Sequence, residues 1–494
     1  MSGLRRAARG LGRALSLLTA TATPLAAQQP SAPPPPLQAA AEAIVGRANE
    51  ADWSAFAWSI DRQQPLFAIH ADDVRLPASN NKVFTSLWAL GVLGPEHRFD
   101  TDVLVSALPG ADGVLRGDVY LRGSGDPTFG YPDFEQDPMR PLRLMAAHLA
   151  KLGVREVTGA VIGDASIFDS VLVGPDWPKD TGGGSARYAP RVSGLAFQRN
   201  LLWVGAEAVP GGGVAVQRWP AVTEIPVVSR ARVGGGRAWA VRPPDGDTIE
   251  IRGAVSGRGA DRYPVGVSHP ALLAAGALRA ALAEQGIAVG EPARVGKAPA
   301  GATLVYRHVS PPLSVMIPML NRHSDNFFAE HLFKATAATV LGEGSYARAG
   351  SASAMFFIRN AGVPYGQLYQ ADGSGLSSHN RASANALVRA LIYAHQAPWA
   401  EVFYNSLAIA GDRDGTMRRM FVGTPAAGRI HAKTGYIRGV RTLSGYVTAQ
   451  NGETIAFSLL YNGRNTNGAR VVETELGTLL AEYGAGATPM AAAR

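Results

Sequence analysis

The sequence predicts a mixed α/β (α+β) fold in which one antiparallel sheet lies between helices and is interrupted by a large, mainly β insert. Three observations lead to this prediction. The chain has 494 residues, 46% of them hydrophobic and 17% charged, so it can bury the cores of two or more domains. Helical and strand patterns occur in the order helix, two strands, helices, three strands, helix. Between residues 99 and 300, glycine-rich turns instead separate short alternating runs, which is typical of strands.

The two ends of the chain are predicted to lie outside the folded domains. Residues 1–27 begin with four arginines followed by a short apolar run, which predicts a secretory signal peptide; the alternative is a disordered basic arm. These arginines supply half of the formal net charge of +8, so nucleic-acid binding is not predicted. Residues 28–36, "QQPSAPPPP", form a Pro-rich linker, and residues 485–494 a flexible tail.

Composition excludes several kinds of chemistry. The chain has no cysteine, so disulfides, thiolate metal sites and a cysteine nucleophile are excluded. Its ten histidines form no HExxH pattern, and we expect neither a metal nor another cofactor. After the leader, no segment is apolar over a length that would cross a membrane.

The folded part divides into a split domain, residues 37–98 and 301–484, and an inserted mainly β region, residues 99–300. The first half is predicted to contain a helix at 37–48, strands at 53–60 and 65–71, and a helix at 81–91 whose apolar face packs into the core. The second half is predicted to contain helices at 311–323, 326–341 and 382–395, strands at 428–436, 441–449 and 453–462, and a final helix at 470–484.

Ser79 and Lys82 are three residues apart, which places the lysine amine beside the serine hydroxyl on one helical face. Of the 47 lysines and arginines, only six are lysines. A lysine can lose its proton where its surroundings disfavour the charge, whereas an arginine stays protonated. Lys82 therefore fits the role of the base that activates Ser79, whose amide at the helix start can stabilise an oxyanion. The alternative is a capping serine followed by a solvated lysine.

Lys433 and Thr434 lie near the end of a predicted strand and can hold a substrate carboxylate by charge and hydroxyl. Gly435 beside them lets a ligand approach the backbone, and the amide of Tyr436 is a candidate second donor to the oxyanion. The alternative is an edge strand with an exposed lysine.

Ser324 and Asn326 fall in the break between two apolar-faced helices. There Ser324 can relay a proton, and Asn326 can orient Lys82 and a substrate amide. The alternative is helix capping by Ser324 or Asp325.

The motifs SxxK, SDN and KTG in this order are the signature of serine β-lactamases and penicillin-binding proteins. Longer stretches, among them "YLRGSGDPT", "YAPRVSGLAFQRN", "DGSGLS" and "AKTGYIRGVRTLSGYV", resemble class C low-molecular-mass penicillin-binding proteins from about residue 51 to 483. This resemblance implies a penicillin-recognising transpeptidase/β-lactamase-like domain split by a long insert. It also implies periplasmic D-Ala-D-Ala carboxypeptidase or endopeptidase action on peptidoglycan stem peptides, with β-lactams as covalent inhibitors.

By the same resemblance, Ser79 is the acylated nucleophile, Lys82 its base, and Asp164 a residue near the side-chain amine of diaminopimelate in the substrate. A turn-forming aspartate is the alternative for Asp164. Two positions depart from the family pattern. Ser378 stands after "DGSGLS" where the family often has arginine, and Tyr436 follows KTG where a small hydroxyl residue is usual. Both changes affect which peptide is accepted.

Two alternative functions stay open at this point. A serine β-lactamase or esterase would use the same acylation chemistry, but a β-lactamase needs a deacylating base, and the sequence places no acidic residue in that role. A non-catalytic wall-binding protein is the other alternative, and the complete set of three motifs argues against it. The oligomeric state is not predicted.

Overall fold

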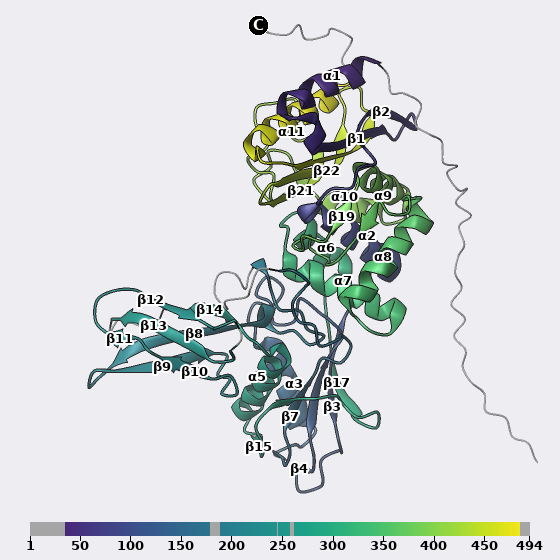
Figure 1. Ribbon diagram of the computed structural model, residues 1–494. Helices are drawn as coiled ribbons and strands as arrows, with labels where there is room; N and C mark the ends of the chain where they lie inside the picture. Colours follow the sequence, from purple (N-terminus) through teal and green to yellow (C-terminus); the bar gives the residue numbers. More distant parts are fainter. Residues whose placement is uncertain (1–34, 178–187, 245, 257–260, 485–494) are drawn as a thin grey trace, which may run out of the picture.

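The computed structural model describes residues 35–177, 188–244, 246–256 and 261–484 (Figure 1). The predicted signal peptide and C-terminal tail, and nearly all of the predicted linker, lie outside these residues. One six-stranded antiparallel sheet forms the centre of the split domain. Its strands, in spatial order, are β2 (Gln64–Ile69), β1 (Trp53–Ser59), β23 (Thr454–Asn462), β22 (Val440–Thr448), β21 (Ile430–Ile437) and β20 (Ala408–Ile409). Because β1 pairs with β23, both ends of the chain complete one sheet, as the sequence predicted.

Two helices from opposite ends of the chain cover one face of this sheet (Figure 1). They are α1 (Pro35–Val45) and α11 (Thr466–Ala481). Leu37 and Val45 of α1 join Leu476 and Leu480 of α11 in one buried cluster with the sheet. Among the described residues, no helix is long and apolar enough to cross a membrane.

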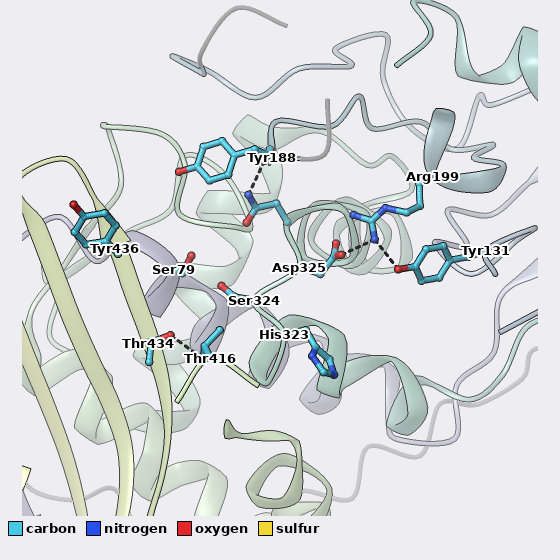
Figure 2. Close-up of a pocket in the computed structure, with 11 residues that line it drawn as sticks. Ser79, Tyr131, Tyr188, Arg199, His323, Ser324, Asp325, Thr416, Thr434 and Tyr436 are labelled. Carbon is cyan, nitrogen blue, oxygen red and sulfur yellow. Dashed lines mark hydrogen bonds and ion pairs between the residues drawn. The ribbon is translucent and has the colours of Figure 1, made fainter. Parts of the chain in front are cut away.

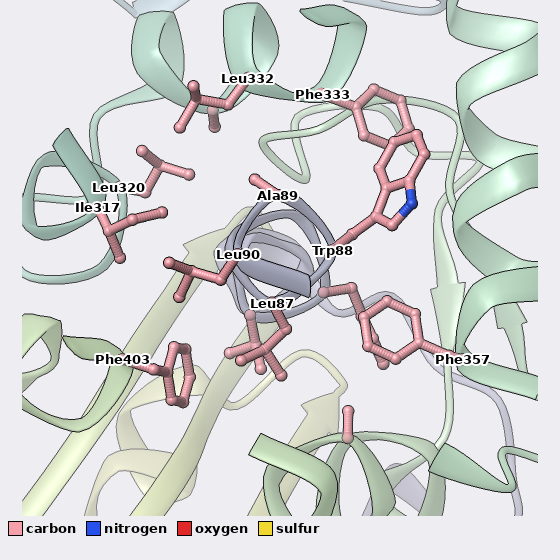
Figure 3. Close-up of a cluster of buried hydrophobic side chains, with 14 of the residues drawn as sticks. Leu87, Trp88, Ala89, Leu90, Ile317, Leu320, Leu332, Phe333, Phe357 and Phe403 are labelled. Atoms are coloured by element: carbon pink, nitrogen blue, oxygen red, sulfur yellow. The ribbon is translucent and has the colours of Figure 1, made fainter. Parts of the chain in front are cut away.

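The other face of the sheet carries the helical part of the domain, built around α2 (Figure 3). Its helices are α2 (Asn81–Leu93), α6 (Leu313–Asn321), α7 (Asn326–Leu341), α8 (Tyr346–Ala361), α9 (Ala384–Gln396) and α10 (Ala400–Ser406). A two-stranded ribbon of β18 (Leu368–Tyr369) and β19 (Arg381–Ala382) lies beside them. Every residue of α2 from Asn81 to Leu90 is buried, so this helix is enclosed on all sides rather than packed by one face.

The insert contains a mixed sheet with two helices. The sheet has the order β16 (Arg294–Val295), β7 (Val161–Asp164), β5 (Val119–Gly123), β3 (Asp100–Val105) and β17 (Thr303–Val309). Helices α3 (Arg140–Lys151) and α5 (Pro270–Glu284) pack beside it in one apolar core. The sequence prediction did not include these helices. It also ended the insert at residue 300, whereas β17 pairs with β3 and so belongs to the insert sheet.

The rest of the insert consists of strands. A small sheet joins β15 (Ala288–Val289), β6 (Glu156–Val157) and β4 (Val114–Leu115). A lobe of strands projects away from the split domain (Figure 1). Its strands are β8 (Leu201–Val209), β9 (Gly213–Trp219), β10 (Val227–Ser229), β11 (Arg232–Val233), β12 (Ala238–Val241), β13 (Ile249–Val255) and β14 (Tyr263–Gly266).

Candidate active site

Ser79 and Lys82 meet where the chain enters α2. Ser79 lies in a short 3₁₀ turn, Ala78–Asn80, that runs directly into this helix, rather than in the first α-helical turn that the sequence predicted. Lys82 Nζ donates a hydrogen bond to Ser79 Oγ over 3.0 Å. The lysine side chain is fully buried, whereas Ser79 is only partly buried and lines a pocket. The serine hydroxyl therefore faces the pocket, and its basic neighbour lies behind it.

Lys82 is held by three acceptors. Besides Ser79, its ammonium donates to Asn326 Oδ1 over 2.6 Å and to the carbonyl of Ser374 over 2.7 Å. Burial lowers the pKa of Lys82 to about 8, because the charged form loses its hydration, while the nearby carboxylates of Glu330, Asp372 and Asp325 act in the opposite direction. Near pH 8, the Lys82 amine is therefore neutral in a substantial fraction of the molecules and can accept a proton.

The second and third motifs meet through another lysine. Lys433 Nζ donates to Ser324 Oγ over 2.9 Å and to the carbonyl of Thr434 over 2.6 Å. Burial, followed by the charge of Lys82, lowers the pKa of Lys433 well below its ordinary value. Ser324 has a left-handed backbone with φ of 58°, a strained conformation that is common at functional sites.

Gly435 lets strand β21 run against the turn that carries Ser79. A Cβ atom at this position would lie 3.0 Å from the Ser79 amide nitrogen and 2.1 Å from Thr442 Oγ1. Thr442 Oγ1 in turn donates to the carbonyl of Pro77, two residues before Ser79. Glycine is therefore required by close packing of the strand on the turn that carries Ser79.

The pocket in front of these groups has a volume of about 480 Å³ (Figure 2). Ser79, Ser324, Asn326 and Thr434 line this pocket, and the hydroxyl of Thr434 donates to that of Thr416, also in the lining, over 2.9 Å. The remaining wall comes from Tyr131, Tyr188, Arg199, His323, Asp325 and Tyr436. Tyr436 is 62% exposed at the rim, and the fully buried Lys82 and Lys433 lie behind the pocket surface. Within the described ranges, no group of three or more histidines or acids could hold a metal.

The chain matches the model of the D-Ala-D-Ala carboxypeptidase 3 (S13) family over residues 37–483. It belongs to this family. It is 34% identical over 443 residues to the D-alanyl-D-alanine carboxypeptidase of Actinomadura sp. (strain R39), which covers 85% of this chain and 79% of that protein. It is 26% identical over 421 residues to D-alanyl-D-alanine carboxypeptidase DacB of Haemophilus influenzae, with coverage of 83% and 85%. The predicted class of enzyme, a serine-type D-Ala-D-Ala carboxypeptidase, is thereby confirmed.

The fold is also that of a solved relative. The crystal structure of penicillin binding protein 4 (dacB) from Haemophilus influenzae superposes with a TM-score of 0.71 at 23% identity, covering 88% of this chain and 97% of that one. Its complex with a β-lactam has a TM-score of 0.68. This likeness confirms the predicted penicillin-recognising fold.

Two buried acids that were not selected from the sequence, Glu330 and Asp372, lie beside the site. Glu330 on α7 accepts from the amides of Gly373 and Ser374 over 3.0 and 2.7 Å, and so holds the loop whose Ser374 carbonyl contacts Lys82. Burial raises the pKa of Glu330 to about 8. Asp372 accepts from the amides of Gly375 and Ser377 in the same loop. The sequence did indicate that Glu330 is buried, because it stands among apolar residues in "NFFAEHLF".

Asp164 is not brought to the pocket. Its carboxylate is 1% exposed, and its two oxygens accept from the amides of Ser166 and Ala298 over 2.9 Å each. It therefore ties the end of β7 to a neighbouring segment. The expected contact of Asp164 with a substrate amine stays a prediction. Ser378 is exposed and donates its hydroxyl to Asp176, away from Ser79 and outside the pocket lining.

Proposed function

We propose that this S13 carboxypeptidase removes the terminal D-alanine of peptidoglycan stem peptides through an acyl-enzyme on Ser79. One observation carries the assignment: the buried amine of Lys82, with its pKa lowered to about 8, lies 3.0 Å from Ser79 Oγ. A weakly nucleophilic hydroxyl needs an adjacent base, and a partly neutral lysine supplies it. β-Lactams would acylate the same oxygen.

In the proposed acylation step, Ser79 Oγ attacks the carbonyl of the D-Ala-D-Ala bond while its proton passes to Lys82. Asn326 and the Ser374 carbonyl keep the amine in place for this transfer. The amides of Ser79 and Tyr436 are proposed to donate to the oxyanion. Collapse of the tetrahedral intermediate breaks the peptide C–N bond, and the proton that Lys82 took from Ser79 passes through Ser324 to the leaving nitrogen, which leaves Lys82 neutral. Water then attacks the ester and gives a proton to Lys82, which returns it to Ser79 Oγ as the ester bond breaks.

The terminal carboxylate of the peptide is proposed to bind at the hydroxyls of Thr434 and Thr416, which meet at the pocket wall. Lys433 supports this site by its charge from behind, because its side chain is buried and donates to Ser324 rather than into the pocket. Gly435 keeps this strand close to Ser79. No cofactor is needed for any of these steps.

We also propose a cellular location and a second substrate for this enzyme. The basic and apolar leader in residues 1–27 supports export, and action on cell-wall peptides is consistent with a periplasmic location. Cross-link cleavage would use the same acyl-enzyme, with a second stem peptide as the leaving group. Separate assays on a D-Ala-D-Ala pentapeptide and on a purified cross-linked dimer measure the two activities.

Mass spectrometry of penicillin-treated protein tests the nucleophile. We expect one penicilloyl mass on the tryptic peptide that contains Ser79, and no adduct in Ser79→Ala. Ser324→Ala is the matched control, because it alters a neighbouring hydroxyl and should retain the site of labelling. A label on Ser324, or none on the wild-type protein, would disprove the assignment.

A further inference from the structure

Among the described residues of the insert, one charged side chain, that of Arg199, lines the pocket. Arg199 lies in a turn, Gln198–Asn200, in which all three residues have left-handed backbones with φ of 49°, 57° and 58°. The turn is held at both ends, since Gln198 N donates to the Phe129 carbonyl over 3.0 Å and Val267 N to the Asn200 carbonyl over 3.1 Å. Three consecutive strained residues persist only where the surroundings enforce them, and such sites are often functional.

The guanidinium of Arg199 is fixed from several sides (Figure 2). Its Nη1 donates to Asp325 Oδ2 over 2.5 Å and to the hydroxyl of Tyr131 over 3.2 Å. Its Cζ lies 5.1 Å from the ring centre of Tyr131 and 5.3 Å from that of Phe327. The side chains of Arg199 and Asp325 are only 10% and 13% exposed, so solvent screens this ion pair little.

Asp325 stands between the two residues that contact the buried lysines. Its Oδ1 caps α7 by accepting from the amides of Phe327 and Phe328 over 2.8 and 3.2 Å, and its Oδ2 is left for Arg199. Ser324 on one side accepts from Lys433, and Asn326 on the other accepts from Lys82. A shift of Asp325 would therefore displace both contacts.

A second contact from the insert reaches the same turn. Asn326 Nδ2 donates to the carbonyl of Tyr188 over 2.6 Å, which fixes the amide so that its oxygen faces Lys82. The insert thus holds the segment Ser324–Asn326 at two points. The contacting residues of the insert are far from Ser79 in the sequence, but they fix the segment whose Asn326 oxygen contacts Lys82, the proposed base.

We propose that Arg199 is a positioning residue: through Asp325 it fixes the turn Ser324–Asn326, and the insert is thereby a working part of the active site. The inference rests on the proposed role of Ser79. Arg199 acts on the acylation rate without contacting the reacting atoms.

The test compares Arg199→Met, Asp325→Asn and the double variant by the second-order rate of penicillin labelling. Asparagine keeps the capping oxygen of Asp325 but removes the charge that pairs with Arg199. We expect each single variant to react about tenfold to hundredfold more slowly, as for loss of a charge-assisted hydrogen bond. The double variant should be no slower than the slower single variant, because both substitutions break one linkage. Arg199→Lys, which retains the charge, should lose less.

Two further measurements distinguish a positioning role of Arg199 from other roles. The loss should be the same factor for β-lactams with different side chains, whereas a substrate-binding arginine would give factors that vary with the side chain. Prolonged labelling should still reach one adduct per chain, because the variant is folded and only slower. Arg307→Met is the matched control: Arg307 pairs with the buried Asp102 in the insert sheet, over 2.8 and 3.1 Å, and neither residue lines the pocket.

Equal rates for Arg199→Met and wild type, an equal loss in Arg307→Met, additive losses in the double variant, or losses that depend on the β-lactam side chain would each overturn the inference. Failure of the proposed function looks different, since the wild-type protein itself would then acquire no label on Ser79.

Discussion

The proposed role of Lys82 as a base depends on surroundings that disfavour its charge. Its ammonium is fully buried, and its three partners are all neutral oxygens, from Ser79, Asn326 and Ser374. The buried acids Glu330 and Asp372 are close enough to favour the charge, but burial outweighs them and leaves the pKa at about 8. The same acids hold the loop that supplies one acceptor, so they affect both the position and the protonation of the lysine.

The pH dependence of acylation follows from this pKa. Below it Lys82 carries a proton and cannot accept another, so the second-order rate of penicillin labelling should rise with pH, with a midpoint near 8, and level off above it. Rapid-mixing measurements across this range give the midpoint. Lys82→Arg should be inactive at every pH, because arginine does not deprotonate under these conditions. A midpoint well below 8 would instead show that a group other than Lys82 sets the pH dependence.

Strand β21 packs closely against the turn before α2 that carries Ser79, the proposed nucleophile. Gly435 allows their approach, and the Thr442 hydroxyl links the neighbouring strand β22 to Pro77. The KTG motif is therefore explained partly by packing: its glycine removes a side chain that would push the strand away from Ser79.

Gly435→Ala tests this explanation. The added methyl would collide with Thr442 Oγ1 and press on the Ser79 amide, so the strand or the turn must move. A displacement of about 1 Å in a catalytic group can cost roughly a hundredfold in rate, and we expect a loss of this order in penicillin labelling. Gly46→Ala is the control, because nothing lies within 4 Å of a Cβ at that position. A normal labelling rate in Gly435→Ala would show that the strand has room to spare.

Local patterns were enough to predict most elements of the catalytic domain. The apolar run after Lys82 predicted α2, and three alternating runs predicted β21, β22 and β23. The helices α3 and α5 were missed because they interrupt a region dominated by glycine-rich turns. Arg199 and Glu330 were not selected because their importance depends on contacts with residues distant in sequence, Asp325 and the loop at Gly373. Contacts of this kind leave no periodic pattern in the sequence from which they could be predicted.

In the whole molecule, the active site is assembled from segments spread along nearly the entire chain. The turn that carries Ser79 precedes α2, the insert provides Tyr131, Tyr188 and Arg199, and β21 near the C-terminal end provides Thr434. The sequence could order the three motifs but could not show that the insert reaches the pocket (Figures 1 and 2). The insert closes one side of a site whose proposed base, Lys82, and proposed carboxylate-binding groups, Thr434 and Thr416, belong to the split domain.

This assembly also predicts how long the acyl-enzyme persists. Asp325 is the one carboxylate among the described residues that line the pocket, and its oxygens are engaged by the amides that start α7 and by Arg199. Glu330 is fully buried against the amides of Gly373 and Ser374. No carboxylate in the described part of the pocket is therefore placed to activate a water molecule for deacylation.

With a peptide substrate, the D-alanine leaves after acylation, and water can enter from the vacated side, where Lys82 accepts its proton. With penicillin, the leaving nitrogen stays tethered to the acyl group and blocks that side, so deacylation would need a separate base. We therefore expect fast peptide turnover and a penicilloyl-enzyme that outlasts many peptide turnovers. A chase of labelled penicillin with unlabelled drug, run beside a D-Ala release assay, measures both lifetimes. Loss of label within seconds, with catalytic consumption of penicillin, would instead identify a β-lactamase.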